Sequence, residues 1–480
     1  MEEAAQQEKE WVIDMTILET VKEAIRGRED KIGFSYGVNR QYIEKNWGEF
    51  YRDVCTLIPF YKGCGHHHVG IMTANGYLLM VHSYAAISAG CAAAVVDPIL
   101  YTPDVSAMLD NSDTTLLLVD TDLTDVAEEM QELAPDRQVM FFPEPGDVMD
   151  EDASEYGMHI CFTSGTSHLS KPVMISQEAV IRTAAAFETA LNGTAEDDTY
   201  LPLSASHIYA YTTTLTLLMR GSKICYGRGI RYTEKDLAYY QPGLVITVPG
   251  HMRAILDSRR IQTYPKYFVV GGSLCTQENF EKASAAGITV QVAYGATETI
   301  GPCTVSDRDG TSRGMRCLSD RQMRLTEDRE ILIAGDLMDE YYLRDAETAK
   351  VLKDGWYYTG DIGYLDEENR LFIEGRIRDI IVTENGEKIN CNEVDDKLQG
   401  MPGSIEVAVF DVEGCMMAAV VPENEFITQE DLEREIEKYN ATQPFSRRVV
   451  QVWRREQMLP RTLVGKLKRA ALTKEWMENH

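Results

Sequence analysis

A stretch rich in hydroxyl groups and glycine, FTSGTSHLSKPV, occupies residues 162–173 and carries a lysine, Lys171, near its end. Hydroxyls and backbone N–H groups around a glycine can wrap phosphate oxygens, and a lysine adds a positive charge. A Walker A loop needs glycine directly before its lysine and serine or threonine directly after it. Here Ser170 and Pro172 flank Lys171, so this is not a Walker A loop. Alone, the stretch predicts either a nucleotide-binding loop or a polar surface turn.

Four further motifs follow this stretch in order: YGATET (294–299), WYYTGD (356–361), EGRIRD (374–379) and LPRTLVGKLKR (459–469). Together with TSGT and Lys171, they resemble the adenylate-forming superfamily, which includes acyl-CoA synthetases, acyl–carrier-protein ligases and amino-acid adenylation domains. The weaker similarities LPLSASH (201–207) and GGSL (271–274) agree with it. The resemblance implies an α/β fold with a large N-terminal domain of several subdomains and parallel-rich sheets, followed by a small mobile α+β C-terminal domain.

The implied reaction is ATP-dependent activation of a carboxylic acid to an acyl-adenylate, with release of pyrophosphate. A thiol of CoA or of a phosphopantetheinyl carrier protein then accepts the acyl group. Because the attacking carboxylate and the α-phosphate are both anions, the site must screen their repulsion and stabilise charge on the phosphoryl oxygens. The expected cofactors are therefore ATP and Mg²⁺, with CoA or the carrier as acceptor.

The resemblance assigns binding of the ATP phosphates to the opening loop, through Thr163, Ser164, Gly165, Thr166, Ser167 and Lys171. The alternative for Lys171 is a solvated lysine on a turn. The family pattern has glycine at the positions of His168 and Pro172, and proline at that of Ser170. Since TSGT is intact and the departures fall in the second half, we expect a loop that still closes over phosphate.

The resemblance assigns the motif YGATET to the nucleotide and its cation. Tyr294, followed by Gly295, matches the family's adenine-stacking aromatic, Thr297 its α-phosphate contact and Glu298 its magnesium ligand. A carboxylate beside a polyphosphate needs a hard cation between them. The alternative for Glu298 is a surface charge at the end of a strand.

Further nucleotide contacts are assigned to Asp361 and Arg376, which suit a ribose diol, and to Gly272 and Ser273. Asp361 and Arg376 could instead be ordinary ion-pair partners.

Lys466 matches the family's mobile catalytic lysine, which together with Thr297 and Glu298 completes the predicted catalytic set. Its alternative is one charge of a basic amphipathic helix. The resemblance also assigns the domain pivot to Arg378 and the thiol tunnel to Gly386. Cys391 stands where the family commonly has proline, so the expectation is weaker for this loop than for the fold.

The sequence says less about which carboxylic acid is the substrate. The stretch SASHIYAYTTTL (204–215) contains no carboxylate to meet an α-ammonium group, so an α-amino acid is not expected. Substrate contacts are assigned to His207, Tyr211 and Gly271, and Ile208 and Tyr209 suit an apolar or aromatic acid. His207 could instead be a packed core residue. The choices between a fatty and an aryl acid, and between CoA and a carrier protein, stay open.

Short apolar runs alternate with helical stretches such as TDVAEEMQEL, which is the signature of parallel α/β architecture with ligands at the carboxyl ends of strands. The uncharged stretch at residues 77–96 imitates a membrane span, but its histidine and small residues favour a buried helix that runs into a buried strand. A change of pattern near Gly375 predicts two domains, residues 1–377 and 378–480.

Composition narrows the class of partner. The 480 residues are 44% hydrophobic and carry a net charge of −29, which disfavours nucleic acid and anionic membranes. Ten scattered cysteines and the acidic start MEEAAQQEKEW predict a cytoplasmic protein with reduced thiols and without a signal peptide. The three consecutive histidines at 66–68 alternate in direction if extended, so a metal site is not expected there.

Two alternatives to the ligase remain. One is an enzyme that forms an acyl-adenylate for a non-thiol acceptor, and the other is a non-catalytic binding module with a decayed site. The presence of Glu298, Asp361 and Lys466 together argues against decay, because a binding module has no use for the lysine.

Overall fold

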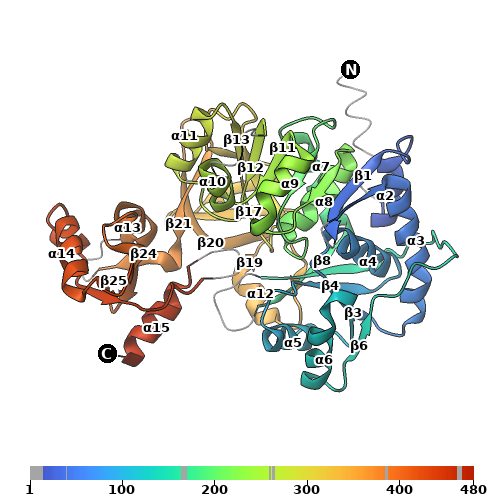
Figure 1. The fold of residues 1–480 in the computed structure, drawn as a ribbon, viewed down its shortest axis with the longest axis horizontal. Helices are drawn as coiled ribbons and strands as arrows, with labels where there is room; N and C mark the ends of the chain where they lie inside the picture. The colour runs from blue at the N-terminus through green and yellow to red at the C-terminus, as the bar shows by residue number, and fades with distance from the viewer. Residues whose placement is uncertain are drawn as a thin grey trace.

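A computed structural model describes residues 15–38, 41–163, 170–258, 261, 265–383, 388–461 and 467–479 of the chain. A larger part carries two extended sheets, and a smaller part, formed by the C-terminal segment, lies at one side of it (Figure 1). The short 3₁₀ helix η4 (Ile377–Asp379) lies between the last long strand of the larger part and the first strand of the smaller part.

The first sheet of the larger part has the strand order β18-β8-β7-β4-β3-β5-β6 in the described residues. Strands β7, β4, β3, β5 and β6 are parallel neighbours, whereas β8 and β18 add antiparallel strands at one edge. Their bounds are β3 His68–Met72, β4 Ala92–Val96, β5 Leu116–Val119, β6 Gln138–Phe141, β7 Met158–Phe162, β8 Pro172–Ser176 and β18 Glu340–Tyr341. The connecting helices include α4 (Gly76–Ser88), α5 (Thr102–Asp110) and α6 (Thr124–Leu133).

The stretch that imitates a membrane span forms helix α4 and strand β4. Asn75 begins the helix, since its side chain accepts hydrogen bonds from the backbone N–H groups of Tyr77 and Leu78. Nearly every residue of α4 is buried, and β4 lies between β3 and β7 with all its residues buried. The predicted buried helix and strand are confirmed. Among the residues described, no helix is long and apolar enough to cross a bilayer.

The second sheet of the larger part has the order β16-β17-β20-β21-β15-β14-β13-β12-β11-β9-β10-β1-β2, with β19 beside β20, within the described chain. Its parallel run is β13 (Thr289–Ala296), β12 (Tyr267–Val270), β11 (Leu244–Thr247), β9 (Thr199–Leu201), β10 (Ile224–Tyr226) and β1 (Ile32–Val38). The other strands are β2 (Gln41–Asn46), β14 (Gly301–Ser306), β15 (Met315–Cys317), β16 (Arg321–Leu325), β17 (Glu330–Gly335), β19 (Leu352–Lys353), β20 (Trp356–Leu365) and β21 (Leu371–Arg376).

Helices of the larger part pack around and between the two sheets (Figure 1). They are α2 (Ile17–Ile25), α3 (Trp47–Gly63), α7 (Gln177–Ala190), α8 (Ile208–Arg220), α9 (Thr233–Tyr240), α10 (Pro249–Asp257), α11 (Gln277–Ala285) and α12 (Asp345–Val351). One buried apolar cluster joins Ile71 of β3, Tyr84 of α4, Leu215 of α8 and Ile246 of β11. Both sheets therefore share a core, which fixes their strand ends relative to each other.

The smaller part is an α+β unit with its own buried clusters. Its elements are β22 (Ile380–Val382), β23 (Lys388–Asn390), α13 (Cys391–Leu398), β24 (Ser404–Val412), β25 (Cys415–Pro422), α14 (Gln429–Asn440), β26 (Gln451–Arg454) and α15 (Arg469–Asn479). The predicted fold class, a large parallel-rich α/β region followed by a small α+β region, is confirmed. Each of the ten cysteines is a free thiol.

Candidate active site

A cavity of about 100 Å³ lies where four parallel strands of the second sheet end. It is lined by Phe162, Leu203, His207, Ile208, Tyr209, Val248, Gly271, Gly272, Ala293, Tyr294, Gly295, Ala296, Thr297, Gly301 and Pro302. The strands that end there are β9, β11, β12 and β13, which are neighbours in the sheet. The carboxyl edge of a parallel sheet is the usual place for a ligand in this architecture.

Two of the lining glycines keep the cavity open. A Cβ atom on Gly271 would lie 3.0 Å from the carbonyl oxygen of Ala293 and 3.2 Å from the ring of Tyr209. Gly272 has a φ of +79°, a conformation that side chains disfavour. Of the residues predicted in this motif, Gly271 and Gly272 line the cavity, whereas Ser273 is exposed and does not.

The motif YGATET forms the end of β13 and the turn that follows it. The hydroxyl of Thr299 accepts a hydrogen bond from the N–H of Ala296 (2.8 Å), and the N–H of Ile300 donates to the carbonyl of Thr297 (3.0 Å). A Cβ on Gly295 would overlap the carbonyl oxygen of Gly301, so only glycine fits there. The turn brings Thr297 to the cavity and Glu298 beside it.

The carboxylate of Glu298 is held by one phenol. The hydroxyl of Tyr341 donates to Oε1 of Glu298 at 2.5 Å, and burial together with this negative charge raises the pKa of Tyr341. Within the described part of the chain, no donor contacts Oε2. One free carboxylate oxygen suits Mg²⁺, which proteins often bind through one or two carboxylates together with substrate phosphates. In the same residues, no cluster of three or more His, Cys, Asp or Glu side chains could hold a metal ion by itself.

Asp361 joins two other predicted residues. It is 7% exposed, and its Oδ2 accepts a hydrogen bond from the hydroxyl of Tyr294 (2.8 Å), while Nε of Arg376 lies 3.0 Å from Oδ1. The pairing of β20 with β21 places Asp361 directly opposite Arg376. Burial and the charge of Asp361 raise the pKa of the Tyr294 phenol, so the phenol stays a donor. The structure thus brings together three residues predicted to meet the nucleoside.

Thr163 and Lys171 close the base of the opening loop. The N–H of Thr163 donates to the carbonyl of Lys171 (3.0 Å), and the N–H of Lys171 donates to the hydroxyl of Thr163 (3.1 Å). The ammonium group of Lys171 lies 2.6 Å from a carboxylate oxygen of Glu347 and 4.5 Å from the centre of the Tyr341 ring.

Several predicted residues lie outside the described part of the chain. They are Ser164, Gly165, Thr166, Ser167 and His168 of the opening loop, Gly386 of the predicted thiol tunnel and Lys466.

Tyr211 does not line the cavity, unlike His207 four residues earlier. Its side chain is 0% exposed, and its hydroxyl bonds to the hydroxyl of Ser83 on α4 and to Nδ1 of His159 on β7 (2.9 Å). The substrate contact assigned to Tyr211 stays a prediction, and in this structure its hydroxyl is directed to Ser83 and His159. Helix α8 is buried on nearly all sides, so its aromatic residues do not all face one ligand.

Seven lining residues were not predicted from the sequence: Phe162, Leu203, Val248, Ala293, Ala296, Gly301 and Pro302. Phe162 is the last residue of β7. Leu203 lies two residues after the end of β9, and Val248 directly follows β11. The rule that ligands gather at carboxyl ends of strands could have found these three. Pro302 lies on β14, and its position depends on the β13–β14 pairing.

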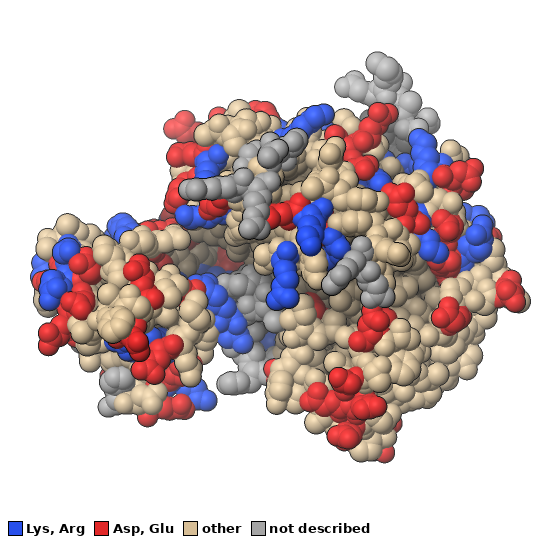
Figure 2. All heavy atoms as spheres, in the orientation of Figure 1, with Lys and Arg blue, Asp and Glu red and all other residues tan. Residues whose placement is uncertain are grey.

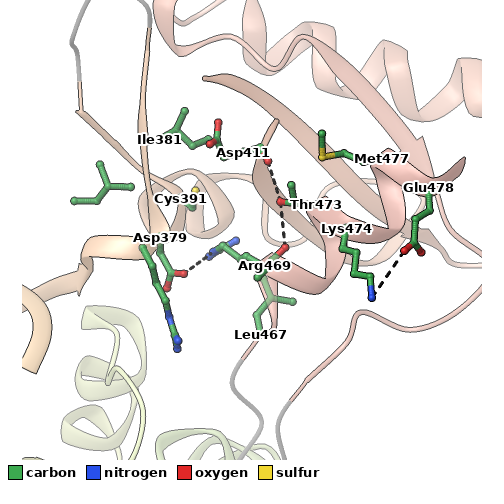
Figure 3. Close-up of a pocket in the computed structure, with 13 residues that line it drawn as sticks. Asp379, Ile381, Cys391, Asp411, Leu467, Arg469, Thr473, Lys474, Met477 and Glu478 are labelled. Atoms are coloured by element: carbon green, nitrogen blue, oxygen red, sulfur yellow. Dashed lines mark hydrogen bonds and ion pairs between the residues drawn. The ribbon is translucent and has the colours of Figure 1, made fainter. Parts of the chain in front are cut away.

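A second pocket, of about 520 Å³, lies beside η4 in the smaller part (Figure 3). Arg378, the predicted pivot, lines it together with Asp379, Cys391 and Arg469. Arg469 donates to the carbonyl of Val409 (2.6 Å) and pairs with Asp379 across 3.7 Å, as Figure 3 shows for the latter pair. Cys391 is 1% exposed, and burial raises the pKa of its thiol to about 12, so it is a poor nucleophile.

Charges of both signs are interspersed on the face shown in Figure 2, with basic side chains between the larger and smaller parts. The bulk negative charge of the chain therefore does not describe the local surface near the junction of the two parts.

The chain is similar in sequence to a known enzyme family and to several of its members. A sequence model described as AMP-binding enzyme matches residues 21–355. A long-chain-fatty-acid–CoA ligase of Mycobacterium tuberculosis is 25% identical over 474 residues, covering 88% of this chain and 90% of that protein. A 2-succinylbenzoate–CoA ligase of Bacillus cereus is 28% identical over 406 residues, covering 77% and 82%.

The fold also matches a solved structure. The O-succinylbenzoate coenzyme A synthetase of Bacillus subtilis, in complex with ATP and magnesium ion, superposes with a TM-score of 0.79 at 19% identity, covering 94% of this chain and 98% of that one. The resemblance drawn from the five motifs is confirmed.

Proposed function

The chain belongs to the AMP-binding enzyme family, and on that premise we propose that it joins a compact apolar or aromatic carboxylic acid to the thiol of CoA. The intermediate is an acyl-adenylate, formed from ATP with release of pyrophosphate. The observation that carries this proposal is the position of the cavity, which is flanked by Thr297, Glu298 and the Tyr294–Asp361–Arg376 group.

Each flanking group has a distinct task in this proposal. Asp361 and Arg376 bind the ribose, and Tyr294 stacks on the adenine while its hydroxyl stays bonded to Asp361. Thr297 and Lys171 contact phosphate oxygens, and Glu298 holds the magnesium ion. Magnesium, when bound, screens the repulsion between the phosphates and the incoming carboxylate. Lys466 approaches from the smaller part and stabilises charge that develops in the transition state.

The size of the cavity supports a compact acid. Pockets for drug-sized ligands have volumes of roughly 300–1,000 Å³, whereas this cavity measures about 100 Å³. Its walls are largely apolar, with Phe162, Ile208, Tyr209 and Val248 facing the space. An aryl or short-chain acid fits such walls better than a long fatty chain.

CoA is the proposed acceptor because both curated relatives named above are CoA ligases. A phosphopantetheinyl carrier protein is the alternative thiol. The proposal includes rotation of the smaller part about Arg378, with the domain boundary between residues 377 and 378.

ATP–pyrophosphate exchange over a panel of acids tests the first half-reaction. The panel contains benzoates and straight-chain acids of increasing length. We expect the highest exchange rates with aryl or short acids and little exchange with long chains. If none of the acids in the panel supports exchange, the result contradicts the enzyme proposal and favours a decayed binding module.

Substitution of a glycine in the cavity wall tests whether the acyl group binds there. Gly271→Ala adds a methyl group against Tyr209 and should remove activity with the bulkier accepted acids while sparing smaller ones. Gly250→Ala is the matched control, because nothing lies within 4 Å of its added Cβ. Equal loss for all acids in Gly271→Ala would place the acyl group elsewhere.

Transfer of the activated acyl group tests the second half-reaction. The accepted acid is supplied with ATP and either CoA or a phosphopantetheinylated carrier protein, and thioester formation is measured. We expect acyl-CoA. Adenylate formation without transfer to either thiol would leave an acyl-adenylate-forming enzyme with a non-thiol acceptor.

A further inference from the structure

One short segment contacts both groups that are proposed to handle the triphosphate and its cation. The segment is strand β18 with helix α12, and the two contacting side chains are Tyr341 and Glu347. Tyr341 donates its hydroxyl to Glu298, and Glu347 pairs with Lys171.

Backbone pairing places this segment beside the base of the phosphate loop. Strand β18 pairs with β8, which begins directly after Lys171, and the register puts Tyr341 opposite Val173. The N–H of Tyr342 also donates to the carbonyl of Pro172 (2.9 Å). Tyr341 therefore cannot shift without moving the strand that follows Lys171.

Helix α12 orients the carboxylate. Glu347 lies in its first turn and accepts a hydrogen bond from Arg344 (2.9 Å), which leaves its other oxygen 2.6 Å from Lys171. The hydrogen bond from Lys171, followed by that from Arg344, lowers the pKa of Glu347, so the carboxylate is charged. The side chains of Lys171 and Glu347 remain 28% and 32% exposed, so an incoming anion can reach the pair.

The ring of Tyr341 completes the arrangement. It is 3% exposed, its centre is 4.5 Å from the ammonium group of Lys171, and its hydroxyl fixes Oε1 of Glu298. A cation over an aromatic face is stabilised without a second negative charge. Lys171 therefore keeps a favourable neighbour when a carboxylate leaves, and Glu298 keeps Oε2 directed toward a cation.

We propose that Glu347 occupies Lys171 in place of a nucleotide phosphate and is displaced when ATP binds, while Tyr341 stays in place and positions Glu298 for the magnesium ion. This inference rests on the proposed function, because it assumes that Lys171 meets phosphate and that Glu298 meets magnesium. Tyr341 is a positioning residue, since it acts through Glu298.

The first test is Glu347→Gln, with ATP as the probe and equilibrium binding measured by calorimetry in the absence of a divalent cation. Removing the competing carboxylate should tighten ATP binding by about 2- to 5-fold, the range for a partly exposed ion pair. The matched control is Glu340→Gln, which removes the same charge from an exposed position on β18 and should leave affinity unchanged. Unchanged or weaker binding in Glu347→Gln would overturn the displacement.

The second test is Tyr341→Phe, which removes the hydroxyl and keeps the ring. Metal-free ATP affinity should stay within 2-fold of wild type, while the gain in affinity on adding magnesium should fall by about 10-fold, as for other residues that orient a metal ligand. Tyr342→Phe removes a hydroxyl that bonds Asp113 instead and should change neither quantity. Equal loss with and without magnesium would overturn the positioning role.

ATP binding by the wild type separates the proposed function from the displacement of Glu347. Wild-type protein that binds no ATP, with or without magnesium, would contradict the proposed function and this inference together. ATP binding in the wild type with no response to Glu347→Gln or Tyr341→Phe would overturn this inference alone. Thermal melting of each variant tests whether the fold is retained.

Discussion

The strand-end cavity of the larger part and the pocket beside η4 in the smaller part are built in opposite ways. Beside the cavity, Tyr294 is fixed by Asp361, 67 residues away, and Glu298 by Tyr341, 43 residues away. Around the pocket, all the lining residues come from one continuous region, residues 378–478, and many of their contacts stay within that region.

The two sets of contacts have different consequences for movement. A site assembled from many strand ends of a shared core keeps its geometry only if the whole sheet stays intact. A unit whose contacts are internal can turn as a body about a few residues at its boundary. In the proposed mechanism, the larger part holds the nucleotide and acid, and the smaller part brings different groups to them.

The largest expected effect comes from Lys466→Ala, which removes the group that the smaller part is proposed to bring to the site. Loss of a donor aimed at transition-state charge costs about 10²–10³ in rate, so ATP–pyrophosphate exchange should collapse by that factor. Transfer from a supplied acyl-adenylate to CoA should largely survive. Lys468→Ala, two residues away, is the control, and equal loss of both half-reactions would remove Lys466 from the catalytic set.

Arg378→Pro tests whether the smaller part must turn. Proline fixes φ near −65°, which suits the 3₁₀ helix η4 but resists the dihedral changes of a pivot. We expect exchange to stay substantially active while thioester formation falls by about 100-fold, the effect of a misplaced reacting group. Arg378→Ala controls for loss of the side chain. If proline lowers both half-reactions together, damage to the fold explains the result instead.

Asp361→Asn tests the nucleoside contacts beside the cavity of the larger part. The amide is a weaker acceptor for Arg376 and Tyr294, and a hydrogen bond to a charged group contributes about 1.5–3 kcal/mol. The value of kcat/KM for ATP should therefore fall by about 10- to 100-fold. Asp366→Asn is the control, because Asp366 pairs with Arg370 across the same hairpin, away from the cavity. A similar loss in both variants would mean that the hairpin, not the ribose contact, is disturbed.

The smallest expected effect concerns acid stability of the larger part. His251 is 6% exposed, bonds to the hydroxyls of Thr233 and Thr247, and has its pKa lowered to about 4 by burial. The unfolded chain then binds the proton more tightly, so this stabilisation is present above pH 6.5 and is lost as pH falls toward 4.

Urea unfolding at pH 7 and pH 5.5 measures that loss. His251→Gln should reduce the drop in unfolding free energy between these two pH values by about 1 kcal/mol. His67→Gln, at an exposed histidine, should leave the drop unchanged. An undiminished drop in His251→Gln would assign the acid sensitivity to other groups.

Much of the fold could be predicted from local sequence patterns. The short apolar runs bounded by turn residues form strands, as at β11 and β12, because such runs specify a strand without help from distant segments. The buried helix and strand at residues 76–96 were legible for the same reason. Helix α8 shows the limit, since its side chains are apolar or small on all faces and the sequence could not tell which face meets a ligand.

The family and the motif residues can be identified from the sequence alone, because each motif is contiguous and its chemistry is carried by residue type and order. The partners of these residues follow from the fold: Tyr341 contacts Glu298, Glu347 contacts Lys171, and Arg376 lies opposite Asp361. No local period encodes these pairs, because they depend on which strands become neighbours in the sheets. The same holds for Tyr211, whose burial follows from the packing of α8 against α4 and β7 rather than from its distance to His207 along the chain.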